Sequence, residues 1–157
     1  MISKETVKAL AKELRGKRVL ELGAGSGILA HHLEKHGVNI VTVDNGSWGG
    51  KWKVYHRTIT DDAMNYFNKN KKKFDVIIMS WPNYEQPLAY KIAKRLSANH
   101  ELIYQGEAYG GCTADDNFHR LWDDRMIDDK KFNARMEKVN IRFDGIHDSW
   151  YKLKRRL

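Results

Sequence analysis

A glycine-rich turn near the N-terminus restricts the fold of this chain more than any other feature. Residues 19–22 are typical of a buried strand, and they run directly into Gly23, Gly25 and Gly27 before a helical pattern begins at Ile28. Glycine adopts positive φ without steric cost and lets the backbone approach a ligand closely, so nucleotide-like ligands lie over such strand-turn-helix units. The pattern predicts an α/β fold with a ligand site at this turn.

The spacing of this turn differs from that of the dinucleotide-binding fingerprint, whose third glycine would fall at Ile28. Glu21 lies at the end of the strand, where a carboxylate repels a pyrophosphate bound at the following helix N-terminus. The same carboxylate tolerates a cationic ligand well. We therefore expect a cationic ligand at this turn and not a dinucleotide.

A second acidic residue, Asp44, ends the next apolar segment, residues 40–44, and stands 21 residues after Gly23. A carboxylate at that place can accept the protons of both ribose hydroxyls, as in nucleotide-binding βαβ units. An ordinary strand-to-helix turn would explain the glycines alone, but it would not explain the acid at this spacing. The two signals together favour a ligand with a ribose.

Residues 21–27, Glu-Leu-Gly-Ala-Gly-Ser-Gly, resemble the first motif of the class I methyltransferases that use S-adenosylmethionine, and Asp44 matches their second acid. The resemblance implies a doubly wound, Rossmann-like three-layer α/β sandwich with a mostly parallel seven-stranded sheet and an antiparallel last strand. It also implies S-adenosylmethionine as cofactor. The residues expected to bind it are Glu21, Gly23, Ala24, Gly25, Gly27, Asp44, Asn45, Asp61 and Ser80.

The adenine contact is the least determined member of that set. In the family, an acid just after the third strand commonly receives the adenine amino group, which indicates Asp61 or Asp62, and we take Asp61. A plain helix N-cap explains Asp61 equally well. Trp48, in the glycine-rich loop after Asp44, is a second candidate for contact with the base, and capping the core is its alternative role.

Residues 80–84, Ser-Trp-Pro-Asn-Tyr, loosely resemble the D/N-P-P-Y/F motif with which amino-directed methyltransferases hold a nitrogen. Ser80 stands where an Asp or Asn is expected, and Asn83 replaces a proline or aromatic residue, so nitrogen methylation is in doubt. We expect Asn83 and Tyr84 at the acceptor, with Glu107 as a base. A proline turn, and a loop charge paired with a lysine, are the alternatives.

Hydrophobic periodicity and turn signals predict the remaining elements. A helix capped by Ser3 ends at Gly16, and later helices are expected at 27–36, after 61, at 86–96, and after Thr113 or Asp115. The predicted strands are 18–22, 40–44, 52–56, 74–79, 101–105, a segment containing Val139, Ile141 and Phe143, and a segment around Trp150.

The charge of the chain is its most informative bulk property. Its 157 residues, expected to form a single minimal methyltransferase-like domain over 1–157, carry a formal net charge of +8. Such a charge either attracts nucleic acid or serves solubility. Three histidines, His31, His32 and His36, fall on one predicted helix, where adjacent histidines face different ways, so we expect no metal site there.

Several observations bear on location and partners. No apolar run approaches the roughly 20 residues that cross a bilayer, the first residues lack the apolar core of a secretion signal, and Cys112 is the only cysteine. We therefore expect a cytoplasmic protein without a membrane partner. Since no insertion is long enough to form a lid, we expect an open acceptor site, completed by a homodimer or partner subunit.

The sequence thus predicts a methyltransferase that acts on an unidentified acceptor, either a nucleic acid or a planar nitrogen-containing molecule. Two alternatives stay open. One is a partner subunit that binds S-adenosylmethionine without transferring its methyl group. The other is a basic nucleic-acid-binding module in which the glycine turn is only structural.

Overall fold

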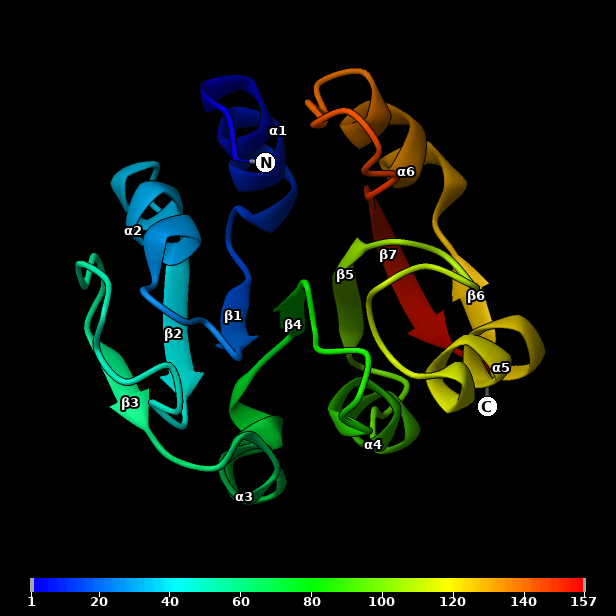
Figure 1. The fold of residues 1–157 in the computed structure, drawn as a ribbon, viewed down its shortest axis with the longest axis horizontal. Coiled ribbons are helices and arrows are strands. Elements are labelled where there is room, and N and C mark those ends of the chain that lie inside the picture. Colours follow the sequence, from blue (N-terminus) through cyan, green and yellow to red (C-terminus); the bar gives the residue numbers. More distant parts are fainter. Residues whose placement is uncertain (1, 157) are drawn as a thin grey trace.

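The chain folds around a seven-stranded sheet of order β3-β2-β1-β4-β5-β7-β6, as a computed structural model of residues 2–156 shows (Figure 1). The strands are β1 (Arg18–Leu22), β2 (Asn39–Asp44), β3 (Thr58–Thr60), β4 (Val76–Ser80), β5 (Glu101–Gly106), β6 (Met126–Asp128) and β7 (Ser149–Arg155). Strands β1 to β5 pair in parallel, whereas β7 pairs antiparallel with both β5 and β6. The predicted fold class is confirmed.

Helices cover both faces of the sheet. They are α1 (Lys4–Leu14), α2 (Ile28–Lys35), α3 (Ala63–Asn70), α4 (Leu88–Lys94), α5 (Asp116–Arg125) and α6 (Lys130–Glu137), with a short 3-10 turn at Lys71–Lys73. In Figure 1, α1, α2 and α6 lie on one face and α3, α4 and α5 on the other. None of the helices within residues 2–156 combines the length and the apolar character needed to cross a membrane.

Alternating side chains of β1 create the two cores of the sandwich. Leu20 and Leu22 pack into the core beneath α3, α4 and α5, whereas Val19 packs into the core beneath α1, α2 and α6. A strand that is buried on both faces needs apolar residues at successive positions, and β1 has them. The central position of this strand places the glycine turn that follows it at the middle of the sheet.

The order of the strands reverses beside β1. The chain passes from β1 outward to β2 and β3, and then returns to β4 on the other side of β1. In open α/β sheets the ligand site lies in the crevice outside the carboxyl ends of the strands at this switch point. The ends of β1, β2 and β4 therefore define where a ligand site is expected.

The third strand differs from its predicted place. Residues 52–56 do not pair with the sheet, and the edge strand is the shorter β3, in which Thr60 pairs with Asp44. The segment before β3 instead crosses over the glycine turn, where the Tyr55 N–H donates to the Ser26 carbonyl at 2.8 Å. The alternation in residues 52–56 therefore reflects an anchored, exposed segment and not a strand.

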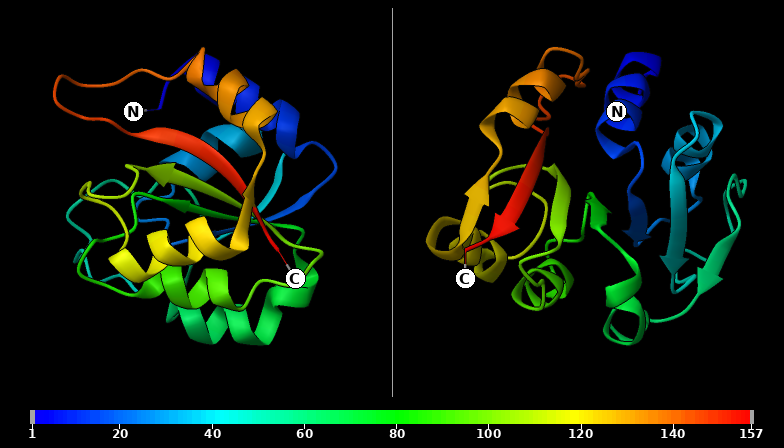
Figure 2. Two further views of the ribbon diagram at one scale, coloured as in Figure 1. Left: turned by 90° about the vertical axis from the view of Figure 1, so that its right-hand side faces the viewer. Right: turned by 180° about the vertical axis from the view of Figure 1, so that it is seen from behind.

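The predicted strand at Val139, Ile141 and Phe143 is also wrong. Ile141 and Phe143 are 45% and 65% exposed, and the strand beside β7 is β6. After β6 the carboxylate of Asp129 accepts the Phe132 N–H at 2.9 Å and so caps the start of α6. The polar residues Asp128–Lys131 do not show the hydrophobic periodicity that would have predicted this helix. Helix α6 lies beside α1 (Figure 2), and the Arg135 guanidinium reaches the Glu13 carboxylate at 2.5 Å.

The packing of α6 gives a first testable prediction. Phe132 is fully buried, so Phe132→Ala should lower the free energy of unfolding by about 3–5 kcal/mol through lost contacts and a cavity. Phe143→Ala removes a ring of the same size from an exposed position and should change stability by less than about 0.5 kcal/mol. Urea unfolding of both variants measures the difference. Equal losses would contradict the observed arrangement of this region.

Candidate active site

A cavity of about 390 Å³ opens at the carboxyl ends of β1, β2 and β4, at the switch point of the sheet. Small-molecule sites in proteins commonly measure about 300–1,000 Å³. Its wall combines apolar side chains with a few polar groups. The lining residues from the first half of the chain are Leu22, Gly23, Asp44, Asn45, Ser47, Asp62, Ala63 and Met64, and those around the end of β4 are Met79, Ser80, Trp81, Pro82, Asn83, Gln86, Pro87, Leu88 and Lys91.

Asp44, at the end of β2, is the most firmly held acid on this wall. Its Oδ2 accepts the Gly25 N–H at 2.8 Å, and its Oδ1 accepts the Gly46 N–H at 2.7 Å. The carboxylate therefore faces the glycine turn, as the spacing predicts. Since each carboxylate oxygen has further acceptor capacity, Asp44 can still bind hydroxyl groups of a ligand.

The three glycines of the turn share a positive φ but differ in the space available for a side chain. All have positive φ, of 69° at Gly23, 56° at Gly25 and 73° at Gly27. A Cβ added at Gly23 or Gly25 would meet no atom within 4 Å, whereas one at Gly27 would lie 2.6 Å from the Cβ of His56. Of the four turn residues predicted to contact the cofactor, Gly23 lines the cavity, and Ala24, Gly25 and Gly27 do not.

Glu21 precedes the wall residue Leu22 in β1 and is buried, with 3% of its surface exposed. Burial raises the pKa of its carboxyl to about 8, and the nearby charge of Asp44 adds to the rise. Its Oε2 has no hydrogen-bond partner within residues 2–156. The site thus holds one fixed carboxylate and one buried carboxyl poised to lose a proton, a combination that favours a cationic ligand over an anionic one.

Of the two adjacent acids after β3, one lines the cavity. Asp62 lines the cavity and caps α3, because its Oδ1 accepts the Asn65 N–H at 2.9 Å. Asp61 is not part of the wall, and its Oδ1 accepts the Asp62 N–H at 2.7 Å. The structure therefore places Asp62, and not Asp61, on the cavity wall.

The end of β4 contributes a strained residue to the cavity. Trp81 has a φ of 52°, a left-handed conformation that costs a non-glycine residue about 1–2 kcal/mol. It is held there by the Trp81 N–H, which donates to the Gln105 carbonyl at 2.8 Å, and by its indole N–H, which donates to Asp148 at 3.2 Å. Such strain persists at functional sites when the surroundings over-determine the conformation.

A polar chain runs from Asp148 to the cavity through Gln105. The Gln105 amide N–H donates to Asp148 Oδ2 at 3.3 Å, and the Ser80 hydroxyl donates to the Gln105 amide oxygen. Because its proton is committed to Gln105, the Ser80 oxygen faces the cavity as an acceptor. Sequence reasoning missed Gln105 and Asp148, since nothing in their spacing relates them to Ser80.

The other predicted acceptor residues are placed unequally. Asn83 lines the cavity, and its Oδ1 accepts the Glu85 N–H at 2.8 Å. Tyr84 is 48% exposed and lies outside the wall. Asn45 lines the cavity, and its Oδ1 accepts the Ser47 N–H at 2.9 Å.

Glu107 lies away from the cavity and is occupied by the backbone. Its Oε2 accepts the Cys112 N–H at 2.6 Å, and its Oε1 accepts the His147 N–H at 3.1 Å. The hydrogen bond from Cys112, followed by that from His147, lowers the pKa of this carboxyl. Glu107 therefore joins two loops and is not placed to remove a proton from a substrate in the cavity.

The described part of the chain, residues 2–156, contains no group of three His, Cys, Asp or Glu side chains that could hold a metal ion. In α2, where the sequence places His31 and His32 side by side, their two rings meet edge to face with centroids 5.2 Å apart.

Comparison with known proteins agrees with this geometry. The family model described as "Methyltransferase domain" matches residues 2–81, which is 80 of the 157 residues and thus just over half of the chain. The chain belongs to this methyltransferase family. No curated protein matches the sequence.

Solved structures share the fold at low identity. A variant of MtNAS in complex with S-adenosylmethionine superposes with a TM-score of 0.60 at 12% identity, over 98% of this chain and 62% of that one. Magnesium protoporphyrin IX methyltransferase from Synechocystis PCC 6803 gives 0.57 at 16% identity, over 98% and 79%. The ribosomal protein L11 methylase of Lactobacillus delbrueckii subsp. bulgaricus gives 0.52 at 16% identity, over 100% and 81%.

These structures define the class I methyltransferase fold for this chain and leave its substrate open. The chain spans less than two thirds of the length of MtNAS. Regions of that protein outside the shared fold therefore have no counterpart within these 157 residues.

The buried carboxyl of Glu21 gives a second prediction. The unfolded chain releases this proton near pH 4.5 and the folded chain holds it until about pH 8, so the free energy of unfolding falls as pH rises across this interval. Glu21→Gln removes the titration. The stability of wild type relative to Glu21→Gln should fall by about 3 kcal/mol between pH 5 and pH 8, measured by urea unfolding. Parallel pH profiles would contradict the assignment.

Proposed function

We propose that this protein transfers a methyl group from S-adenosylmethionine to a planar, nitrogen-containing acceptor. The observation that carries the proposal is the carboxylate of Asp44, which lies on the cavity wall and is held by the Gly25 N–H at the switch point of the sheet. Membership of the methyltransferase family supports the reaction type. We propose that residues 1–157 act as one minimal domain.

The residues of the cavity fit this cofactor. Asp44 offers oxygens to ribose hydroxyls, and Asp62 offers a carboxylate beside the apolar wall of Ala63 and Met64, where an adenine would be bound. Gly23 allows close backbone approach, and the acidic surroundings of Glu21 suit a ligand that carries a positive charge. A dinucleotide would bring its pyrophosphate against the same acids.

The residues at the end of β4 would receive the acceptor. S-adenosylmethionine supplies an electrophilic methyl group on a good leaving group, so the protein contributes mainly orientation and exclusion of water. The indole of Trp81 offers a flat surface, and the Ser80 oxygen can accept an N–H of the acceptor because Gln105 holds the hydroxyl proton. Asn83 adds a neutral polar group to the same wall.

This arrangement changes the proposed roles of two residues. Ser80, which the sequence grouped with the cofactor contacts, is proposed for the acceptor side because its hydroxyl belongs to the polar chain through Gln105. Glu107 is left out because both of its oxygens accept backbone N–H groups. Transfer to a neutral acceptor nitrogen then gives a cationic product, which loses its proton to bulk water after release.

We also propose a cytoplasmic location, because the single cysteine, Cys112, is a free and exposed thiol. Tyr84, the neighbour of the wall residue Asn83, is exposed, and a second subunit or a nucleic acid remains the proposed partner on the acceptor side of the cavity. The strong positive charge supports the nucleic acid.

The cofactor assignment predicts a loss of affinity on one conservative substitution. Asp44→Asn removes the charge that strengthens hydrogen bonds to ribose hydroxyls, and it should weaken S-adenosylmethionine binding about 10- to 100-fold in calorimetry. Asp61→Asn is the matched control, because Asp61 is the sequence neighbour of the wall residue Asp62 but does not line the cavity, and it should bind as wild type does. Absence of binding by wild type would reject the proposal.

The acceptor assignment predicts a separation of binding from transfer. Ser80→Ala should lower the rate of methyl transfer about tenfold, since one oriented hydrogen bond is lost, while S-adenosylmethionine affinity changes less than twofold. Labelled methyl groups are followed into the nucleic acid, protein and metabolite fractions of a cell lysate. Cofactor binding without transfer to any fraction would instead favour the partner subunit that binds S-adenosylmethionine without catalysis.

A further inference from the structure

The segment between β2 and β3 has a composition that the proposed catalytic site does not explain. Residues 45–60 contain no Asp or Glu, although the whole chain has 20 such residues. Within this stretch, Lys51, Lys53 and Arg57 alternate or nearly alternate with aromatic and apolar residues. An acid-free segment of this kind carries a local positive charge that no carboxylate of its own offsets.

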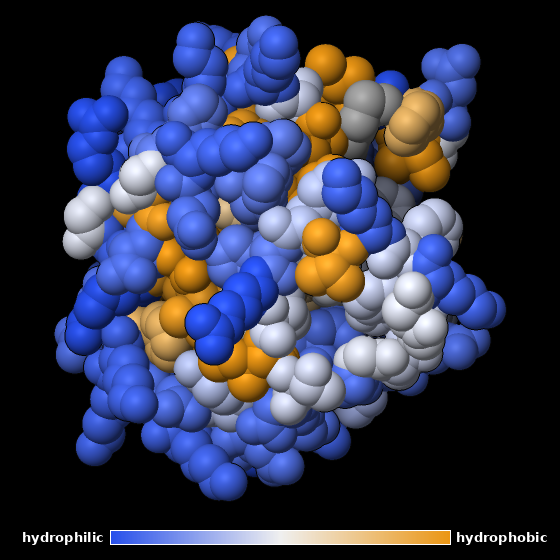
Figure 3. Space-filling view, turned by 90° about the vertical axis from the view of Figure 1, so that its left-hand side faces the viewer, coloured by the Kyte–Doolittle hydropathy of each residue, from blue (hydrophilic) through white to orange (hydrophobic). Residues whose placement is uncertain are grey.

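The large side chains of this segment face solvent. Trp52 is 69% exposed, Val54 60% and Tyr55 37%, whereas Trp150 in the core is 1% exposed. Figure 3 views the molecule from this edge of the sheet and shows hydrophobic and weakly polar residues open among strongly hydrophilic ones. Grouped exposed apolar side chains with a polar rim mark interaction surfaces.

The backbone behind these side chains is anchored to the glycine turn. The Tyr55 N–H donates to the Ser26 carbonyl at 2.8 Å, and the ring of His56 contacts Thr42 Oγ1 at 2.9 Å and the Glu34 carboxylate at 2.6 Å. The close approach of Gly27 to His56 fixes the same crossing. The exposed rings are therefore presented from a defined backbone.

Charge and aromatic surface come together at Tyr55. The Lys53 ammonium lies 5.2 Å from the centroid of the Tyr55 ring, and the His31 ring lies 5.9 Å from it. A base can stack on such a ring while a lysine meets the adjoining phosphate. Single strands expose both groups, whereas the bases of a duplex are stacked on one another.

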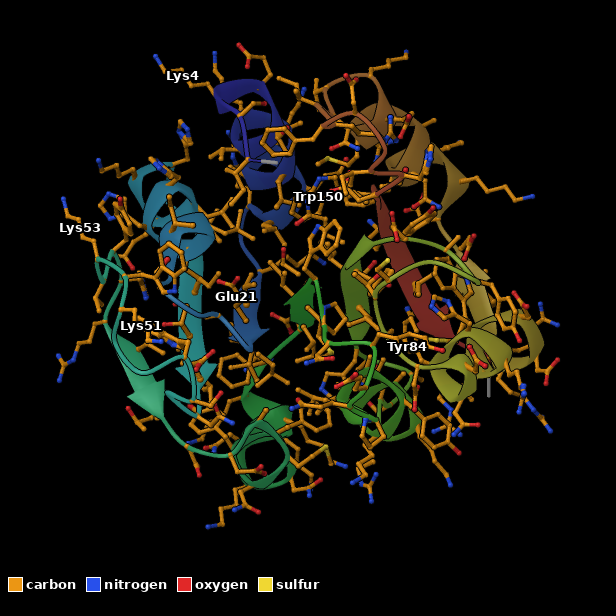
Figure 4. All side chains as sticks on the ribbon, in the orientation of Figure 1. Lys4, Glu21, Lys51, Lys53, Tyr84 and Trp150 are labelled. Atoms are coloured by element: carbon orange, nitrogen blue, oxygen red, sulfur yellow. The ribbon has the colours of Figure 1, made fainter. Side chains whose placement is uncertain are left out.

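The segment also continues directly from the cavity wall. Asn45 and Ser47 line the cavity, and Lys51 follows four residues after Ser47. Figure 4 shows Lys51 and Lys53 on the β3 side of the molecule, with Lys53 pointing away from its body. A single strand of nucleic acid bound along this segment would therefore run beside the open cavity.

We propose that residues 51–57, the basic aromatic segment, bind single-stranded nucleic acid and so provide the acceptor strand for the active site. Trp52 and Tyr55 stack on bases, and Lys51, Lys53 and Arg57 bind phosphates. The role of this segment in methyl transfer rests on the proposed function, whereas its binding of single-stranded nucleic acid does not. The two are therefore tested separately.

Fluorescence anisotropy with a labelled RNA of about 12 uridines, without cofactor, tests the stacking. Trp52→Ala should weaken binding roughly tenfold, the effect of losing one stacked base. Phe143→Ala is the matched control, because it removes an equally exposed ring from the distant segment between α6 and β7, and it should leave the affinity unchanged. Equal affinities of wild type and Trp52→Ala would overturn the proposal.

The salt dependence of the same binding tests the phosphate contacts. Lys51→Gln combined with Lys53→Gln should lower the slope of log affinity against log salt by about 1.4, or about 0.7 for each lost contact with a single strand. Lys69→Gln combined with Lys72→Gln removes the same charge from exposed positions in the last turn of α3 and in the 3-10 turn that follows it, and should not change the slope. An equal fall in both double variants would show general electrostatics only and would overturn the proposal.

Two further measurements separate the remaining outcomes. Sedimentation velocity that shows a dimer lost in Trp52→Ala, with no RNA binding, would assign the surface to a second copy and reject the nucleic acid. Calorimetry with S-adenosylmethionine on Trp52→Ala should match wild type. RNA binding without S-adenosylmethionine binding would reject the proposed function and keep this inference. S-adenosylmethionine binding without RNA binding would reject this inference and keep the proposed function.

Discussion

The hydrogen bond from the Gly25 N–H to the Asp44 carboxylate is the contact on which the site depends. It ties the turn after β1 to the end of β2, and the second oxygen of Asp44 holds the Gly46 N–H at the start of the next segment. One side chain thus fixes three stretches of backbone around the cavity. A carboxylate can do this because it accepts several hydrogen bonds and its charge strengthens each of them.

Negative charge near that contact defines the kind of ligand the site favours. Burial, and after it the charge of Asp44, raises the pKa of the Glu21 carboxyl to about 8, which keeps this group largely protonated at neutral pH. A bound cation would favour the ionised form of Glu21 and would thereby couple ligand binding to proton release. The acidic floor and the basic outer surface of the molecule are therefore suited to different ligands, a cation inside and a polyanion outside.

The segment before β3 links these two regions. Its backbone and His56 close over the glycine turn, which explains why Gly27 can carry no side chain, while Trp52 and Lys53 face outward. A regular strand in residues 52–56 would have placed alternate side chains against the sheet and hidden half of this surface. The departure from regular structure is thus the feature that exposes the rings.

The sequence by itself determined the strand-turn-helix at Glu21–Gly27, the second acid at Asp44, the cap at Ser3, and the five parallel strands apart from the place of β3. These depend on local periodicity, capping and glycine spacing, which neighbours along the chain largely decide. The class of cofactor site followed from the same residues.

Only the tertiary structure decided the rest. It placed Asp62 and not Asp61 at the cavity, removed Glu107 by engaging both of its oxygens with Cys112 and His147, and joined Ser80 to Asp148 through Gln105. It also buried Phe132 of α6 and exposed Phe143, against the apparent strand pattern. The physical reason is common to all of these. Each depends on contacts between residues that lie far apart in the chain or on which of two neighbours faces inward, and hydrophobic spacing along one segment carries no information about its partner.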